Sequence, residues 1–281
     1  MRTINVEEIT KAISKMAMES CYYLPKEVVA KLELFKKDEE SPLGKEIIDT
    51  ILENATLAKK KDVPICQDTG LTVVFMEIGQ DVHFEGGYLV EAVNAGIAKG
   101  YIDGYLRKSL VDDPLFLRKN TNDNTPAVLH TTIVPGDKVK IIVFPKGCGS
   151  ENMGAMAMLK PSDGVEGVIK FVVDTVKKAG PNPCPPITVG IGIGGNMEKS
   201  ALLAKHALTR VIGTPNPNPK YAELEKEILR AVNKTGVGPS GLGGTTTAIA
   251  VNIEYVATHI GSLPVSVNLN CHAARRAEIV L

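Results

Sequence analysis

Apolar residues recur at spacings of three and four through the first quarter of the chain, which predicts helices there. In the first helix Ile4, Ile9, Ile13 and Met16 share one face, and Thr3 is placed to act as the N-cap. Each later segment pairs a similar apolar stripe with a Lys/Glu-rich face. The predicted helices cover residues 3–20, 25–35 and 45–60, with a break over residues 41–44.

Farther along, shorter β-branched runs are bounded by Gly, Pro, Asn and Asp, a pattern typical of strands. Two of these runs are joined by Pro135-Gly136-Asp137 and predict a β-hairpin. No repeat or low-complexity linker interrupts the chain. We therefore predict one mixed α+β domain over residues 1–281, its helical N-terminal part packed on mixed β-sheets. The expected strands cover residues 71–78, 127–133, 138–144, 187–193, 245–257 and 264–269, and the later helices residues 88–99, 163–178, 198–211 and 221–233.

The charge balance excludes some classes of partner. The 281 residues carry 32 Lys and Arg against 32 Asp and Glu, so there is no basic footprint for nucleic acid. We find no secretory signal at the N-terminus and no apolar run long enough to span a membrane. The five cysteines are odd in number, which argues against a disulfide framework. These features predict a cytoplasmic protein whose thiols are free, catalytic or metal-bound.

Three of the five cysteines lie in Gly-, Pro- or Asn-rich loops rather than on apolar faces. Cys66 precedes a predicted strand, and Cys184 is enclosed by four prolines that stiffen its loop. Cys271 follows the last predicted strand and is expected at a helix start, where Arg275 and Arg276 one turn later favour a thiolate. These loops are expected to converge on one site.

Three thiolates can hold a [4Fe–4S] cluster and leave one iron open for Lewis-acid chemistry. The chain contains no Cys-x-x-Cys pair, so the spacing alone does not identify a cluster. A closed zinc site completed by His259 or His272 is the competing interpretation. Three purely structural cysteines are a further alternative.

Two glycine-containing segments are candidates for anion binding. Gly190, Gly192 and Gly195 match the G-x-G-x-x-G pattern of dinucleotide sites. However, a Pro/Asn run over residues 215–219 occupies the place of the next strand and its ribose-binding acid. We therefore favour a tight turn at a helix start over a nucleotide site. In the loop 146–152, backbone N–H groups beside glycines can face an anion.

Four ordered motifs stand out along the chain. They are Cys66-Gln67-Asp68-Thr69-Gly70, Lys146-Gly147-Cys148-Gly149-Ser150-Glu151-Asn152, Cys184-Pro185-Pro186, and Cys271 with His259 twelve positions before it. In these motifs the chain resembles the class I fumarases, and more closely the α subunits of two-subunit fumarate hydratases and L-tartrate dehydratases. The resemblance covers nearly the whole chain.

The resemblance implies the reversible hydration of fumarate to (S)-malate, a citric acid cycle reaction, at the open iron of a [4Fe–4S] cluster. It also implies a separate β subunit, in an α2β2 assembly, that supplies groups this chain lacks. Cys148 stands where single-chain members tend to carry glycine, and we take it as a non-ligand near the substrate. The implied residues are the cluster ligands Cys66, Cys184 and Cys271, the catalytic Asp68 and His259, and the substrate contacts Gln67, Asp68, Arg107, Gly149 and Asn152.

Three alternatives to a fumarate hydratase are kept. The α subunit of an L(+)-tartrate dehydratase would use the same chemistry on a different hydroxy acid. A non-catalytic zinc- or nucleotide-binding module would depend on zinc or NAD for folding. A non-catalytic assembly subunit would carry no cluster.

Overall fold

The computed structural model describes residues 2–281, and its contacts divide the chain into two compact units. Unit 1 comprises the N-terminal residues up to Leu24, Ala55–Cys148 and Arg275–Leu281. Unit 2 comprises Pro25–Asn54 and Gly149–Ala274. Both combine helices with mixed sheets, which confirms the α+β class. The single domain over residues 1–281 stays a prediction.

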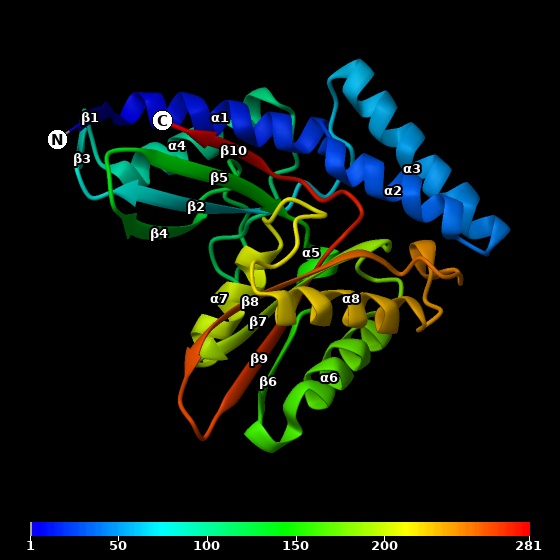
Figure 1. Cartoon of the computed structure of the whole chain (residues 1–281). Coiled ribbons are helices and arrows are strands. Elements are labelled where there is room, and N and C mark those ends of the chain that lie inside the picture. The colour runs from blue at the N-terminus through cyan, green and yellow to red at the C-terminus, as the bar shows by residue number, and fades with distance from the viewer. Residues whose placement is uncertain (1) are drawn as a thin grey trace. The chain divides into compact units, whose positions relative to one another are not determined.

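Unit 1 is built around a four-stranded sheet of order β10-β5-β2-β4. The central strand β2 is buried along most of its length, whereas β4 lies at the edge and is largely exposed. Helix α1 lies along β5 and β10, as Figure 1 shows, and α4 packs against α1. The elements are β1 (Arg2–Asn5), α1 (Val6–Tyr22), β2 (Leu71–Gly79), β3 (Val82–Glu85), α4 (Leu89–Asp103), β4 (Val128–Val134), β5 (Val139–Lys146) and β10 (Ala277–Val280).

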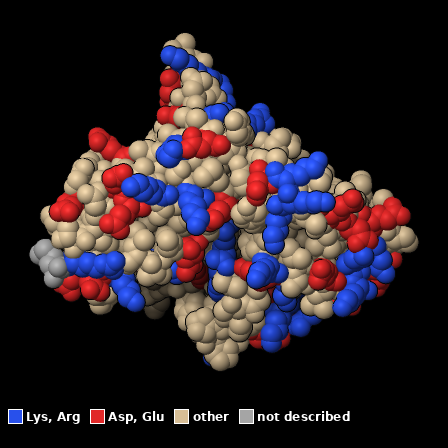
Figure 2. Space-filling model, turned by 90° about the horizontal axis from the view of Figure 1, so that it is seen from above, with Lys and Arg blue, Asp and Glu red and all other residues tan. Residues whose placement is uncertain are grey.

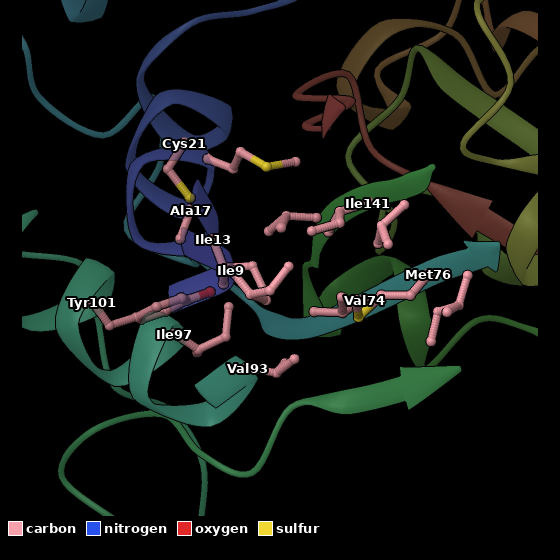
Figure 3. Packing of buried hydrophobic residues seen from close by; sticks show 14 of the residues in the cluster. Ile9, Ile13, Ala17, Cys21, Val74, Met76, Val93, Ile97, Tyr101 and Ile141 are labelled. Carbon is pink, nitrogen blue, oxygen red and sulfur yellow. The ribbon is translucent and has the colours of Figure 1, made fainter. Parts of the chain in front are cut away.

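The core of unit 1 lies where α1 and α4 meet the sheet (Figure 3). Ile9 and Ile13 of α1 point toward Ile97 of α4 and toward the strands that carry Val74 and Ile141. Each of these five side chains is fully buried. The spacing of apolar residues in the sequence therefore predicts the buried face of α1 correctly.

Unit 2 contains a second four-stranded sheet, of order β6-β9-β7-β8. Strand β7 runs parallel to β8 and antiparallel to β9. The elements that lie in this unit or begin or end in it are α2 (Lys26–Asp38), α3 (Pro42–Lys61), α5 (Cys148–Glu151), β6 (Ala155–Leu159), a 3-10 turn (Pro161–Asp163), α6 (Gly164–Ala179), β7 (Ile187–Gly195), α7 (Met197–Ala207), α8 (Pro219–Asn233), a 3-10 turn (Pro239–Gly241), β8 (Ala248–Thr258) and β9 (Leu263–Asn270).

The two faces of β7 have different neighbours, because side chains alternate along a strand. Val189 and Ile191 pack into the core that α6 and α8 help to form. On the other face, a Cβ at Gly190 would lie 2.3 Å from the main-chain oxygen of Ala204, and one at Gly192 would lie 2.0 Å from that of Ser200. These glycines allow α7 to approach the strand closely, so the G-x-G-x-x-G match reflects helix packing.

Four sequence expectations are wrong in detail. The segments 127–133 and 138–144 do not form a hairpin, because β2 pairs with both and lies between them. The first helix begins at Val6 with Asn5 as its N-cap, since residues 2–5 pair with β3 as a strand. Residues 41–44 do not form a complete break, because α3 already begins at Pro42. No helix follows Cys271, whose next regular element is β10.

The surface charge agrees with the composition. Lysine and arginine are interspersed with aspartate and glutamate over the face drawn in Figure 2. Of the helices within residues 2–281, none is both long and apolar enough to cross a membrane.

Candidate functional site

The loop between α3 and β2 carries Cys66 and its polar neighbours in unit 1. The buried Ile65 anchors it, donating its N–H to the main-chain oxygen of Cys21 at 3.0 Å. Cys66 is half-buried, and its Sγ donates to Oε1 of the exposed Gln67 at 3.4 Å. The loop is therefore anchored at Ile65, and it places the thiol of Cys66 beside the amide of Gln67.

Asp68 is held by three contacts within unit 1. Its Oδ1 accepts the N–H of Gly70 at 3.1 Å, and its Oδ2 accepts the N–H of Cys148 at 2.8 Å. Its main-chain oxygen accepts Nη1–H of Arg275 at 2.6 Å. Because Arg275 is only 2% exposed, this guanidinium is a buried support under the loop. The carboxylate is consequently fixed in direction, as an acid or base that acts on a bound molecule needs to be.

The glycine at position 147 keeps this arrangement compact. A Cβ there would lie 3.2 Å from Oδ2 of Asp68 and 3.3 Å from Nη2 of Arg275. Both distances are tighter than ordinary van der Waals contact. A side chain at this position would therefore push the carboxylate or the guanidinium away.

Arg107 follows α4 and is tied to the same loop through its backbone. Its main-chain oxygen accepts the hydroxyl hydrogen of Thr69 at 3.0 Å. The buried Tyr101 hydroxyl donates to the main-chain oxygen of Thr69 at 2.6 Å, which fixes the backbone of the loop at this residue. Burial raises the pKa of this phenol well above its ordinary value, so Tyr101 stays neutral and acts as a donor. Arg107 itself is exposed, which leaves its guanidinium in reach of an anionic ligand.

In unit 2 the sheet brings Cys184 and Cys271 to one end. Cys184 precedes β7 and Cys271 follows β9, and these strands are antiparallel neighbours. The main-chain oxygen of Cys184 accepts the backbone N–H of His272 at 3.3 Å and lies 3.1 Å from its Nδ1. The two cysteines are therefore held by adjoining backbone. His272 bonds to this backbone oxygen through its ring.

The backbone at Cys184 is left-handed, with φ of 55°, which a non-glycine residue adopts at a free-energy cost of about 1 kcal/mol or more. The exposed thiol projects from between the buried Pro183 and Pro185. Ser240, also left-handed at φ of 53°, donates its N–H to the oxygen of Pro185 at 2.9 Å. This hydrogen bond connects the glycine-rich loop 236–244 to the loop that carries Cys184. Strain that the surroundings enforce in this way is typical of functional positions.

One predicted substrate contact, Gly149, lies near the same loop. Gly149 is exposed, and a Cβ there would lie 3.0 Å from the main-chain oxygen of Asn182, two residues before Cys184. Asn152 is exposed as well. Within unit 2, Gly149 is therefore adjacent to the Cys184 loop.

His259 lies elsewhere in unit 2. It sits in the turn between β8 and β9, where its Nδ1 accepts the N–H of Gly261 at 3.1 Å. Because Cys184 lies before β7 and His259 after the parallel strand β8, the length of the sheet, roughly 25 Å, separates them. The structure of this unit does not bring His259 to the two cysteines. The catalytic role of His259 stays a prediction.

The chemistry of the thiols fits an iron–sulfur ligand set. Cys66, Cys184 and Cys271 are exposed or half-buried, so each is accessible to a metal. By contrast, burial raises the pKa of Cys21 to about 11, and this thiol stays protonated in the core. Neither unit, as described over residues 2–281, contains three or more His, Cys, Asp or Glu grouped as a metal site of its own. Cys148 is exposed, and its backbone N–H serves Asp68.

Sequence reasoning missed the roles of Arg275 and Gly147. Arg275 was noticed only as a charge near Cys271, whereas its contact joins positions 207 residues apart. Gly147 was counted among loop glycines, and no local pattern distinguishes it from Gly149.

Comparison with known proteins adds independent information. A family model described as Fumarate hydratase (Fumerase) matches residues 10–280. A protein of Methanocaldococcus jannaschii named "Putative L(+)-tartrate dehydratase subunit alpha" is 42% identical over 275 residues, which are 96% of this chain and 96% of that protein. The L(+)-tartrate dehydratase alpha subunits of Escherichia coli O157:H7 and of Escherichia coli strain K12 are each 34% identical over 278 residues, covering 98% of this chain and 91% of theirs. The similarity therefore extends through both units.

Proposed function

Because the chain belongs to the fumarate hydratase family, we propose that it is the α subunit of an iron–sulfur hydro-lyase that interconverts fumarate and (S)-malate. The observation that carries this proposal is the fixed carboxylate of Asp68, held by two backbone N–H groups beside Cys66 and Gln67. Removing water from malate breaks the C2–O and C3–H bonds and forms the double bond of fumarate. A fixed acid or base beside a metal ligand suits that reaction.

The thiolates of Cys66, Cys184 and Cys271 are the proposed ligands of a [4Fe–4S] cluster. Their accessibility supports this choice over Cys21, which is buried and protonated. When bound, a cluster with three protein ligands supplies a Lewis acid that stabilises the departing hydroxide.

The remaining roles concern binding and proton transfer by side chains of this chain. Arg107 binds one substrate carboxylate through its forked guanidinium. Gln67 donates from its amide to a substrate oxygen, and Gly149 and Asn152 orient the ligand. Asp68 exchanges a proton with the substrate or holds the group that does so. Its two backbone donors keep the carboxylate in one direction and so reduce the reorganisation that the reaction requires.

A separate β subunit is proposed to complete the enzyme, in an α2β2 assembly. The relatives' names support this, since each is called an alpha subunit. Within this family, the proposed reaction is the fumarate step of the citric acid cycle.

The dehydration of L(+)-tartrate is the second candidate. The names of the relatives at 42% and 34% identity favour it. Tartrate has a second hydroxyl at C3, and its dehydration yields an enol that becomes oxaloacetate. Both substrates are 2-hydroxydicarboxylates, so Arg107 and Gln67 would serve either.

A substrate panel tests the proposal. The chain is co-expressed with the β subunit of a related L(+)-tartrate dehydratase, reconstituted with iron and sulfide without oxygen, and given fumarate, mesaconate or L(+)-tartrate. We expect the highest kcat/KM for fumarate. A strong preference for tartrate would replace fumarate with the second candidate, and no activity on any of the three would reject the hydro-lyase.

A further inference from the structure

Residues 108–126 of unit 1 follow Arg107 and take no part in the proposed reaction; this segment is here called the finger. Its two arms are joined by backbone hydrogen bonds from Asp112 to Lys119 at 2.9 Å and from Thr121 to Leu110 at 3.0 Å. At its base, Asn124 is buried and donates from Nδ2 to the oxygen of Gly70 at 3.1 Å. The finger is therefore an ordered element.

The tip of the finger presents three consecutive apolar side chains to solvent. Leu115, Phe116 and Leu117 are 72%, 82% and 85% exposed. Both carboxylate oxygens of Asp113 accept backbone N–H groups of these three residues, which fixes the turn. These hydrogen bonds lower the pKa of Asp113. Together the three side chains expose on the order of 400 Å² of apolar surface, about half of one partner's share of a standard interface.

Two acids and two bases flank the tip. Asp113 accepts N–H groups of the tip backbone, and the exposed Asp112 accepts the N–H of Asp113 at 2.7 Å. Arg118 donates from Nη1 to the main-chain oxygen of Pro114, so the exposed Lys119 is the cation of the tip that we consider for pairing with a partner. Arg118 has a left-handed backbone, with φ of 48°, and adopts this strained conformation at the end of the apolar run. A partner for this tip needs an apolar recess with an acidic edge.

Unit 2 contains such a recess, here called the groove, which is lined by residues from the start of α6, the start of α8 and the β8–β9 turn. Its volume is about 620 Å³, enough for several large side chains. Its apolar wall includes Val165, which is 56% exposed, and Ile260, which is 93% exposed. Its charged lining residues are Lys220, Glu223 and Glu227, so acids outnumber bases there. Glu223 already pairs with Lys226 and Arg230, so Glu227 is the acid more available to an incoming cation.

We propose that the finger tip of one copy of this chain docks in the groove of a second copy, with Lys119 facing Glu227. Two such contacts related by a twofold axis would bury both apolar surfaces and close a dimer. The contact supplies the α–α association that an α2β2 assembly requires. It uses none of the three proposed cluster ligands, although His259, whose catalytic role stays a prediction, is among the residues that line the groove.

Sedimentation equilibrium of the full chain without β subunit provides the first test. We expect a dimer, and we expect Phe116→Asp and Val165→Asp each to raise the dimer Kd at least about tenfold, as loss of a buried apolar anchor does. Ile133→Asp is the control, since Ile133 is 64% exposed on the edge strand β4 and outside the contact. Circular dichroism melting of each variant checks that it folds.

Mixing the two monomeric variants provides the decisive test. The Phe116→Asp chain keeps an intact groove and the Val165→Asp chain keeps an intact finger, so an equimolar mixture can form one contact. We expect dimer in the mixture and monomer in each variant alone. The double variant K119E/E227K is likewise expected to dimerise more tightly than either single variant.

Two results would overturn the proposal. One is a wild-type chain that stays monomeric, or a mixture of variants that does. The other is a Phe116→Asp chain that dimerises normally and fails only to bind the β subunit, which would assign the finger to that partner.

Discussion

Nη1 of Arg275 donates to the main-chain oxygen of Asp68 at 2.6 Å, and this contact joins the end of the chain to the loop of the candidate site. The guanidinium is almost completely buried. A buried charge is tolerated only where hydrogen bonds compensate for its lost hydration. Burying the guanidinium of Arg275 costs free energy of hydration, and the hydrogen bond that it makes fixes the backbone at Asp68.

Replacing Arg275 with methionine should destabilise unit 1 and impair activity. The substitution keeps the apolar stem but leaves the oxygen of Asp68 without this donor, and we expect a loss of about 2–4 kcal/mol in the free energy of unfolding. Urea titration followed by circular dichroism measures this loss. Arg276→Met is the matched control, because Arg276 lies 3.8 Å from Glu278 in a more exposed pair and should change stability by less than about 1 kcal/mol. Equal effects of the two substitutions would refute the special role of Arg275.

Gly147→Ala should affect catalysis more than folding. The new Cβ would approach Oδ2 of Asp68 and Nη2 of Arg275 to 3.2 and 3.3 Å, so the carboxylate must shift by a few tenths of an ångström. We expect about a tenfold or greater loss in kcat, in line with the sensitivity of catalysis to small misplacements. Steady-state kinetics of the reconstituted enzyme measures it. Thermal melting of the same variant is the control, because an unchanged Tm separates an effect on catalysis from an effect on folding. Unchanged kcat in Gly147→Ala would mean that the position of Asp68 does not limit the reaction.

Gly192→Ala should strongly destabilise unit 2. A Cβ there would lie 2.0 Å from the oxygen of Ser200, so α7 must move away from β7. Overpacking of this kind costs about 1–3 kcal/mol or more. Thermal melting should show a clear fall in Tm. A variant that folds normally but loses affinity for NAD would instead support the dinucleotide interpretation of these glycines.

Glu39 should make stability depend on pH. Burial acts to raise its pKa, but hydrogen bonds from the backbone of Thr245, Ser41 and Thr246 outweigh burial and lower it below the ordinary 4.5. The stabilisation is therefore present above the unfolded-state pKa and is lost as pH falls through the lower folded-state value.

The matching variant is Glu39→Gln, which keeps the shape but weakens the acceptor. We expect it to lower the free energy of unfolding by about 1–3 kcal/mol at pH 7 and by less near pH 3, because the stabilisation falls as the pH drops below the ordinary value of 4.5 toward the lower folded-state pKa. Urea titrations at both pH values measure the difference. Glu40→Gln, on an exposed neighbour, should show neither effect. A difference between wild type and Glu39→Gln that grows toward acid would contradict the assigned direction of the pKa.

The sequence predicts local structure well and long-range pairing poorly. The apolar spacing of Ile9 and Ile13 and the β-branched run of β2 depend on near neighbours, and both predictions are confirmed. The strand that pairs with β4 cannot be predicted from the residues next to β4 in the sequence. A short Pro-Gly-Asp turn favours a hairpin, whereas the buried β2 takes the central place between β4 and β5.

The candidate site shows the same limit. Asp68 and Gln67 were identified through their motif, but the support from Arg275 depends on tertiary structure alone. His259 was chosen by resemblance, and the strand directions of unit 2 put it at the opposite end of the sheet from Cys184. The periodicity of a strand does not report which of its ends faces a ligand.

Cluster content in cysteine variants tests the central claim most directly. Wild-type chain, Cys184→Ser and Cys148→Ser are reconstituted without oxygen, and iron, sulfide, visible absorption and electron paramagnetic resonance are measured. Both residues are exposed cysteines, so each variant controls for the other. The account predicts that Cys184→Ser loses the [4Fe–4S] signal and that Cys148→Ser keeps it. Retention of the cluster in Cys184→Ser, or its loss in Cys148→Ser, would contradict the account.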